Sequence, residues 1–358
     1  MAKLQNHLMG FSKPDLLVAF QDYFCHYHEK KGKYDDRISL TEKRKAIDFQ
    51  IKEQIAKLAN IPTVDGIDPK VLATAPQYQW ATFAVVGALV DSILPEALID
   101  SIGLYTEFKF GGFGDSANFK ITPRDLFIVS KGGKGNLTTE VKKQFNGNVT
   151  ITPEVREMTV ATSLYRVLAG EEDMAEFAMK AAKSLEAQMS YDAYTALATA
   201  LDALPTTGSN ALKVAGYSQS ALINLCQKVT VWNGGKTAAI VGTKAALASI
   251  LPANSNYRYT LESDFVKIGF IKEFGGYAVI ELPQVADYTT EFGLKLADNR
   301  IYVISPSADK LIKGFVEGSM LSLVSPFENN ADLTQTTTMK KSYGFAVATS
   351  AIAGNITI

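Results

Sequence analysis

Residues Gly170 to Pro205 read GEEDMAEFAMKAAKSLEAQMSYDAYTALATALDALP and carry the strongest helix signal in the chain. Three acidic residues, Glu171 to Asp173, would occupy the first turn, where the helix dipole favours negative charge, and Pro205 would end the helix. Its apolar stripe consists of Met174, Phe177, Ala181 and Leu185, followed by Leu197, Leu201 and Leu204. A helix from Glu171 to Leu204 would be roughly 50 Å long. Ser190 to Ala193 are the residues at which it would kink or break.

Before this helix the sequence alternates between apolar and polar residues, which is typical of strands. Phe108-Lys109-Phe110 and Asn118-Phe119-Lys120-Ile121 show the alternation, and the glycines between them favour strand pairing. Leu126 to Val129 and Asn148 to Thr152 continue it. We therefore expect a long β-hairpin whose polar tip consists of Lys131, Gly132, Gly133, Lys134, Gly135 and Asn136. Such a hairpin is marginal alone and should contact another molecule.

The first part of the chain is predicted to contain an amphipathic helix. Ser39 and Glu42 have the spacing of a capping box, and Ile47, Ile51, Ile55 and Leu58 then follow at helical spacing. With Asp15 to His28 before it, this segment resembles an arm. The longest apolar run, Trp80 to Leu98, is interrupted by Asp91, Pro95 and Glu96, so it predicts buried structure and no membrane span.

After the long helix, a polar break at Thr206 to Asn210 precedes short strands and helices that predict a compact α/β lobe. Its expected strands are Ala238 to Val241, Tyr277 to Leu282 and Arg300 to Ile304, with a helix from Thr243 to Leu251. Two last stretches, Leu321 to Val324 and Gly344 to Thr349, are strand-like, and the polar run Thr334 to Lys341 lies between them. The fold class predicted from this order is α+β.

The overall charge argues against a protein that seeks anionic partners. The chain has 358 residues and a formal net charge of -1, from 36 basic and 37 acidic residues. Long-range electrostatics therefore supply no attraction for nucleic acid or for an anionic membrane. Two cysteines, Cys25 and Cys226, are too few for a disulfide framework and predict buried thiols in a reducing cytoplasm. The start shows no export signal.

The most suggestive catalytic motif is Asn233-Gly234-Gly235-Lys236-Thr237, which resembles the end of a phosphate-binding P-loop. That loop needs a glycine where Thr230 stands, and it follows a strand, whereas here the predicted strand follows the glycines. A turn before a strand is the better interpretation. The glycines at Gly111 to Gly114 do not lead into a helix N-terminus either, so no phosphate loop is expected there.

No metal, cofactor or catalytic residue is predicted elsewhere. Cys25-His26-Tyr27-His28 offers three potential ligands, but neighbouring side chains on a helix diverge and no second Cys/His cluster completes a site. The remaining histidine, His7, is not near a nucleophile motif. The aromatic residues around Phe108 and Phe119 lack the interleaved basic residues of a base-stacking surface, which favours packing in a sheet.

Taken in order, these features resemble the major capsid proteins of tailed bacteriophages with the Hong Kong 97-type fold. The phrases that carry the resemblance are Ser92-Ile93-Leu94-Pro95, Gly114-Asp115-Ser116-Ala117-Asn118-Phe119, Val149-Thr150-Ile151-Thr152-Pro153, Ala239-Ile240-Val241-Gly242-Thr243, Ile280-Glu281-Leu282-Pro283 and Tyr343-Gly344-Phe345-Ala346-Val347-Ala348. They extend from about Ala81 onward, and the segment before Ala81 is similar only in character.

The resemblance implies a division of the chain. It comprises an N-terminal arm (1–80), a segment leading into the hairpin (81–104), an E-loop hairpin (105–155), a peripheral domain with a long spine helix (156–205), an axial α/β domain (206–318) and return strands of the peripheral domain (319–358). Some relatives join an E-loop lysine to an asparagine of a neighbour. Here Lys131 or Lys134 with Asn329 or Asn330 are the residues in question, but the link is not expected, because no catalytic acid for it is identifiable.

The function implied is that of a shell subunit without enzymatic activity. It would assemble with itself as hexamers and pentamers into an icosahedral virion capsid, in the cytoplasm of a host bacterium, around double-stranded DNA held without specific contacts. A separate scaffolding protein, a portal and decoration proteins are the other expected partners, and the arm is expected to persist along neighbouring subunits. The alternatives are an encapsulin-type compartment shell and a nucleotide-dependent enzyme using Gly234 to Thr237.

Overall fold

The computed structural model describes residues 14–30, 32–60, 76–121, 146–163, 174–206, 211–250, 268–287, 290–324 and 334–358. Its helices are α2 (Pro14–Tyr27), α3 (Leu40–Leu58), α5 (Pro76–Ile102), α7 (Met174–Asp202), α8 (Gln219–Trp232) and α9 (Lys244–Ala248). The strands before the lobe are β1 (Thr106–Gly111), β2 (Ala117–Ile121), β3 (Gly147–Ile151) and β4 (Glu154–Ser163). Those that follow are β5 (Lys213–Ala215), β6 (Ala239–Gly242), β7 (Glu273–Phe274), β8 (Tyr277–Glu281), β9 (Ala286–Asp287), β10 (Gly293–Leu294), β11 (Arg300–Ile304), β12 (Ile312–Val324), β13 (Thr334–Val347) and β14 (Gly354–Thr357).

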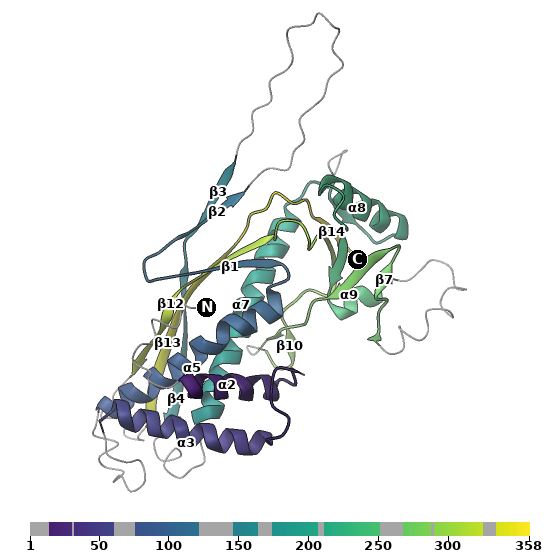
Figure 1. Ribbon diagram of the computed structural model, residues 1–358. Coiled ribbons are helices and arrows are strands. Elements are labelled where there is room, and N and C mark those ends of the chain that lie inside the picture. Colours follow the sequence, from purple (N-terminus) through teal and green to yellow (C-terminus); the bar gives the residue numbers. More distant parts are fainter. Residues whose placement is uncertain are drawn as a thin grey trace, which may run out of the picture.

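Two sheets and one long helix organise the molecule (Figure 1). A four-stranded sheet has the order β1-β12-β13-β4, with β1 parallel to β12 and the other pairs antiparallel. Together with α2, α3, α5 and α7 it forms what we call the body. A six-stranded mixed sheet has the order β5-β14-β11-β6-β8-β7 and forms, with α8 and α9, the α/β lobe. The α+β class is therefore confirmed.

Helix α7 is the expected long helix, and it runs unbroken through Ser190 to Ala193. It begins at Met174 within the described residues, since 164–173 lie outside them. Its buried side chains include Ala178, Leu185, Met189, Leu197 and Leu201. Small alanines between the larger residues let neighbouring elements approach the helix closely. One helix can therefore contact the other elements of the body and also the lobe.

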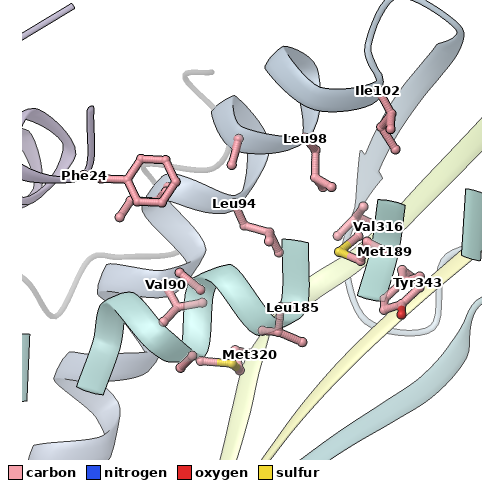
Figure 2. Packing of buried hydrophobic residues seen from close by; sticks show 14 of the residues in the cluster. Phe24, Val90, Leu94, Leu98, Ile102, Leu185, Met189, Val316, Met320 and Tyr343 are labelled. Atoms are coloured by element: carbon pink, nitrogen blue, oxygen red, sulfur yellow. The ribbon is translucent and has the colours of Figure 1, made fainter. Parts of the chain in front are cut away.

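The core of the body lies between α5, α7 and the four-stranded sheet. Figure 2 shows Val90, Leu94, Leu98 and Ile102 of α5 facing Leu185 and Met189 of α7, with Val316, Met320 and Tyr343 of the sheet beside them. Helix α5 includes the apolar run that predicted buried structure, and Pro95 lies inside it. Apolar side chains on several sides of α5 are buried, because helices cover it on one side and the sheet covers it on the other.

The lobe buries both faces of its sheet, and alternate residues of one strand reach different cores. In β11, Ile301 and Val303 pack with α8 and α9, whereas Tyr302 and Ile304 belong to the core that includes α7. This alternation follows from the two-residue period of a strand. The predicted strands at β6, β8 and β11 are confirmed, and the predicted helix after Thr243 is the shorter α9, with Thr243 as its N-cap.

Two expectations about strands were wrong. The polar run Thr334 to Lys341, which was placed between two strand-like stretches, is itself part of β13. Its threonines are β-branched and suit a strand that has solvent on one side. The alternating stretch at Phe108 does not pair with the one at Phe119, since β1 pairs in parallel with β12 and β2 pairs with β3.

Candidate functional site

The base of the β2–β3 hairpin is the first candidate interaction element. Ala117 pairs with Ile151 and Phe119 with Val149, and Figure 1 shows both strands leaving the body beyond the four-stranded sheet. A small core of Ala117, Phe119, Ile151 and Phe315 joins the hairpin to β12. The predicted hairpin is thus confirmed at its base, which packs against β12.

A single lysine reinforces this base. The Lys109 ammonium donates to the carbonyl of Asn118 at 2.6 Å and lies 4.3 Å from the centre of the Phe119 ring. A cation over an aromatic face adds roughly 0.5–1 kcal/mol at an exposed site. Gly112 N donates to Asp115 Oδ2 at 2.7 Å and so fixes the turn between β1 and β2. These contacts set the position from which the hairpin departs.

The predicted contact residues at the tip lie outside the described residues. These are Lys131, Gly132, Gly133, Lys134, Gly135 and Asn136. Asn329 and Asn330, the asparagines considered for a cross-link, lie outside them as well. The role of the tip in contacts between subunits therefore remains a prediction.

The second candidate element is the outer face of the four-stranded sheet, which we define by Leu321, Leu323, Thr338, Lys340, Val155, Glu157 and Thr159. Leu321 pairs with Lys340 and Lys340 with Glu157, while Leu323, Thr338 and Thr159 form the next row. Leu323 is 59% exposed and Leu321 53% exposed. No described helix covers this face, whereas α5 and α7 cover the opposite one.

Polar contacts on the outer face leave its apolar residues accessible. Lys340 pairs with Glu157 at 3.0 Å, and the hydroxyls of Thr159 and Thr338 share a hydrogen bond of 3.0 Å. Exposed ion pairs of this kind contribute about 1 kcal/mol or less, so they order the surface more than they stabilise the fold. This face was not predicted, because the polar run Thr334 to Lys341 was placed between strands and not inside one.

The lobe carries two further exposed apolar groups. At the end of α8, Val231 is 71% exposed and Trp232 68% exposed. At the β9–β10 turn, Phe292 is 95% exposed and has a positive φ of 56°. A bulky residue in the left-handed region is strained, so both its exposure and its backbone need support from elsewhere. Large exposed apolar side chains are typical of surfaces that contact other proteins.

Helix α7 is tied to the lobe by one carboxylate at its last residue. Asp202 accepts hydrogen bonds from Arg300 and from Asn355 Nδ2, the latter at 3.0 Å, and lies 3.4 Å from Lys213 Nζ. These partners come from β11, β14 and β5 respectively. One side chain thus connects the helix to three strands of the six-stranded sheet.

A cavity of about 250 Å³ separates α7 from the lobe beside this connection. Lys295 at its wall donates to Gln188 Oε1 at 3.0 Å and lies 4.5 Å from the Tyr191 ring. Its basic residues, Lys295 and Arg300, thus both have partners on α7. The cavity therefore separates two parts of the fold and offers no obvious site for a charged ligand.

The N-terminal helices α2 and α3 pack against the rest of the body in their own chain. Phe20 and Phe24 of α2 and Ile51 and Ile55 of α3 belong to the core that contains α5 and α7. The capping box of α3 is confirmed, with Ser39 accepting from Glu42 N at 3.3 Å. This segment is thus a helical layer in the isolated chain, and its role as an arm in an assembly stays a prediction.

Ion pairs hold that layer in place. Lys43 Nζ lies 2.7 Å from Asp22 Oδ2 and is almost fully buried, while Lys30 and Lys33 both donate to Asp100 of α5 at 3.0 Å. Burial favours a raised pKa for Asp100, but the hydrogen bonds from these two lysines outweigh it, so the pKa is lowered. Charged contacts therefore link α2 and the turn after it to α5.

The ligand-like stretch at Cys25 is part of this layer. Burial, with help from Lys183 and Lys30, lowers the pKa of His28 to about 4. Cys25 and Cys226 are both buried free thiols, and burial raises the pKa of each. Among the described residues no group of three or more His, Cys, Asp and Glu side chains is arranged to hold a metal ion.

The P-loop-like stretch forms a turn. Asn233 is the C-cap of α8, Gly234 and Gly235 have positive φ, and Lys236 Nζ donates to the carbonyl of Ser307 at 2.7 Å. The Asn233 side chain bonds both backbone groups of Ile352 at 2.8 Å. The predicted turn before a strand is confirmed, and the lysine faces a backbone carbonyl.

None of the helices that the structure describes is long and apolar enough to cross a bilayer.

Comparison with solved structures finds capsid structures among those similar to this chain. The mature capsid of bacteriophage PhiM1 matches with 10% identity and a TM-score of 0.47, over 71% of this chain and 85% of that one. The capsid of cyanophage P-SCSP1u matches with 12% identity and a TM-score of 0.47, over 71% and 86%. The chain resembles phage capsid subunits in fold. A virus-like particle from Pyrococcus furiosus matches with 12% identity and a TM-score of 0.41, over 73% and 96%.

Sequence comparison adds nothing to this likeness, since no family model matches the chain and no curated protein is similar to it. The identities of the solved structures are low and their TM-scores lie below 0.5, so the function proposed below rests on the geometry of this chain.

Proposed function

We propose that this chain is the major capsid protein of a tailed bacteriophage, with the Hong Kong 97-type fold. The observation that carries the proposal is the β2–β3 hairpin, whose base is fixed by a small core while the strands leave the body. A two-stranded hairpin is marginally stable in water, so a hairpin that leaves the body from a fixed base is suited to contact a neighbour. The uncovered outer face of the four-stranded sheet offers a second surface of the same kind.

The division of the chain follows from the same assignment. The hairpin region 105–155 is the E-loop, although its first strand β1 pairs with β12; α7 with β4, β12 and β13 is the peripheral domain, and the α/β lobe is the axial domain. Six or five copies would group into hexamers and pentamers through heterologous contacts, which close into rings. The exposed apolar groups at Trp232 and Phe292 suit such contacts, because each is unsupported in the isolated chain.

The proposed contents of the shell are double-stranded DNA held by confinement. A formal net charge of -1 gives no strong attraction for phosphate, so packaged DNA would touch the lining without base-specific contacts. A separate scaffolding protein, a portal and decoration proteins would complete the particle. We propose no enzymatic activity and no cofactor for this subunit, and a virion capsid assembled in the bacterial cytoplasm as its location.

The test is assembly of the full chain, expressed alone and together with its neighbouring genes. We expect sedimentation and negative-stain microscopy to show rings or closed shells. A variant lacking residues 131–136 should keep the wild-type circular dichroism spectrum and lose most of its shell yield. Replacing those six residues by six glycines and serines is the matched control, because it keeps the reach of the hairpin and removes its side chains.

The outcomes separate the alternatives. A monodisperse monomer at every concentration and salt would contradict a shell role. Shells that enclose a protein cargo and exclude DNA would favour an encapsulin-type compartment. Nucleotide binding by the soluble subunit, abolished by Lys236→Ala, would favour the nucleotide-dependent enzyme at Gly234 to Thr237.

A further inference from the structure

Strand β12 contains a bulge directly beneath the hairpin base. Its pairing with β13 shifts between Glu317 and Leu321, so the residues between them have no ladder partner in β13. Gly318 in this bulge has a positive φ of 50°, a conformation that glycine adopts without steric cost. A bulge leaves backbone groups to be satisfied by other means, and here the N–H of Met320 is buried and the carbonyl of Gly318 is partly buried.

A buried ion pair satisfies them. Asp91 of α5 accepts the backbone N–H of Met320 at 2.6 Å on Oδ2 and the Lys341 ammonium at 2.7 Å on Oδ1. Lys341 of β13 also donates to the carbonyl of Gly318 at 2.8 Å. The side chains of Asp91 and Lys341 are only 9% and 5% exposed. The pair therefore connects a helix to both sides of the bulge.

The same bulge carries the turn that leads into the hairpin. Gly114 N donates to Glu317 Oε1 at 2.5 Å. The Phe113 ring lies over Gly318 so closely that a Cβ on this glycine would stand 2.6 Å from Cε1 of the ring. Strand β2 begins at Ala117, three residues after Gly114. The position of the bulge thus determines where the hairpin begins.

Stability alone does not explain the pair. Removing two charges from water costs about as much as their attraction returns, and apolar residues of similar volume often stabilise a protein equally well or better. What apolar residues cannot do is bond the N–H of Met320 and the carbonyl of Gly318. The value of Asp91 and Lys341 therefore lies in the geometry that they impose on the bulge.

We propose that Asp91 and Lys341 are positioning residues that fix the direction in which the β2–β3 hairpin leaves the body. They act through the bulge at Gly318 and through Phe113 and Gly114, which rest on it. The inference concerns the geometry of one chain and takes only its purpose, aiming the hairpin at a neighbour, from the proposed function.

The main variant is the double substitution Asp91→Leu with Lys341→Met, which removes the charges and keeps the core filled. A second variant, Glu317→Ala, leaves the ion pair intact and breaks the contact between the bulge and Gly114. Lys340→Met is the matched control, because it removes a neighbouring lysine whose partner, Glu157, lies on the outer face. All are made in the full chain.

Hairpin direction is measured as the distance between spin labels at Asn148→Cys on β3 and Lys45→Cys on α3. Labelled chains are diluted into an excess of unlabelled chain, so that each distance is within one subunit. A second label pair, at Lys45→Cys and Lys228→Cys, reports whether the body and the lobe keep their relation. Cys25 and Cys226 are buried, and labelling of the unmodified chain checks that they do not react.

We expect the double variant and Glu317→Ala to broaden or shift the hairpin distance, with the second pair unchanged and Lys340→Met like wild type. A folded double variant with the narrow wild-type distance overturns the proposal, because the pair is then only a core contact. If the double variant does not fold, Glu317→Ala decides: a wild-type distance overturns the proposed route and a broadened one supports it.

Shell formation is read separately. If the wild-type chain forms no shells, the proposed function fails, while the intramolecular distances still test the positioning of the hairpin. If shells form and the double variant folds with a broadened hairpin distance, its shell yield should fall as well.

Discussion

The two sheets of this molecule differ in how many of their faces are covered. The six-stranded sheet of the lobe has apolar residues on both faces, with α8 and α9 on one side and the α7 core on the other. The four-stranded sheet of the body is covered by α5 and α7 on one face, whereas the hairpin base reaches its other face at Phe315 and no described helix covers the outer face. A sheet that is covered twice stabilises its own chain, whereas one that is covered once keeps a surface for other molecules.

The largest effect is expected inside the doubly covered sheet. Ile301→Ala on β11 removes a fully buried side chain between the helices and the sheet. It should lower the free energy of unfolding by about 2–5 kcal/mol, through lost burial and the cavity that remains. Urea unfolding followed by circular dichroism measures this. A loss below 1 kcal/mol would show that this core relaxes around the cavity and is less rigid than its packing implies.

A smaller effect is expected where the two parts of the fold join. Asp202→Ala removes the carboxylate that binds Arg300, Lys213 and Asn355. We expect a loss of about 1.5–3 kcal/mol in the free energy of unfolding, the range for hydrogen bonds to charged groups. Asp202→Asn is the matched control, since the amide still accepts a hydrogen bond. Equal losses in both variants would show that charge, and not hydrogen bonding, joins α7 to the lobe.

The helical layer that covers the body should respond to acid. The pKa of His28 in the folded chain is about 4, below its ordinary value of 6.5, so the folded state disfavours the charged ring. Its contribution to stability is therefore complete above pH 6.5 and is lost as the pH falls from 6.5 towards 4. The loss should be on the order of 1–2 kcal/mol, because water reaches part of the ring.

Unfolding at a series of pH values, for wild type and His28→Phe, isolates that contribution. The free energy of unfolding of the wild type should fall relative to that of the variant as the pH falls, since the variant has no imidazole ring to protonate. A difference that stays constant from pH 7 to pH 4 would refute the assignment.

The smallest effect on stability is expected on the outer face. Leu323→Thr replaces an exposed leucine by a residue that suits a strand, so the free energy of unfolding should change by less than about 0.5 kcal/mol. Shell yield should nevertheless fall, because the face would lose apolar area for contact. Met339→Thr, in the neighbouring strand but on the covered face, is the contrasting variant and should cost stability. A Leu323→Thr chain that assembles normally would remove this face from the proposed contacts.

Sequence reasoning predicted the parts whose signals are local. The buried strand at Ala239 and the helix ending before Pro205 each carry their pattern within a few turns or residues. The hairpin was predicted from alternation and glycine, and β2 with β3 confirms it at its base. The turn at Asn233 was predicted by the order of glycines and strand.

What was missed depends on distant residues or on the surroundings of a strand. Thr334 to Lys341 was placed between two strands and not inside one, because all of its residues except Met339 are polar. The partner of β1 is a strand about two hundred residues later, and periodicity contains no record of that pairing. The buried pair of Asp91 and Lys341 spans 250 positions, so neither residue could be told from a surface charge.

Helix α7 has a consequence for how the chain loses its structure. Its side chains pack in a core that contains residues of both sheets, such as Tyr343 of β13 and Tyr302 of β11. Neither part can melt while the other retains this helix intact, so the two should unfold cooperatively. A calorimetric scan should accordingly show one transition, with a van't Hoff enthalpy equal to the calorimetric enthalpy. A protease that cuts within α7 should therefore uncouple the unfolding of the body from that of the lobe.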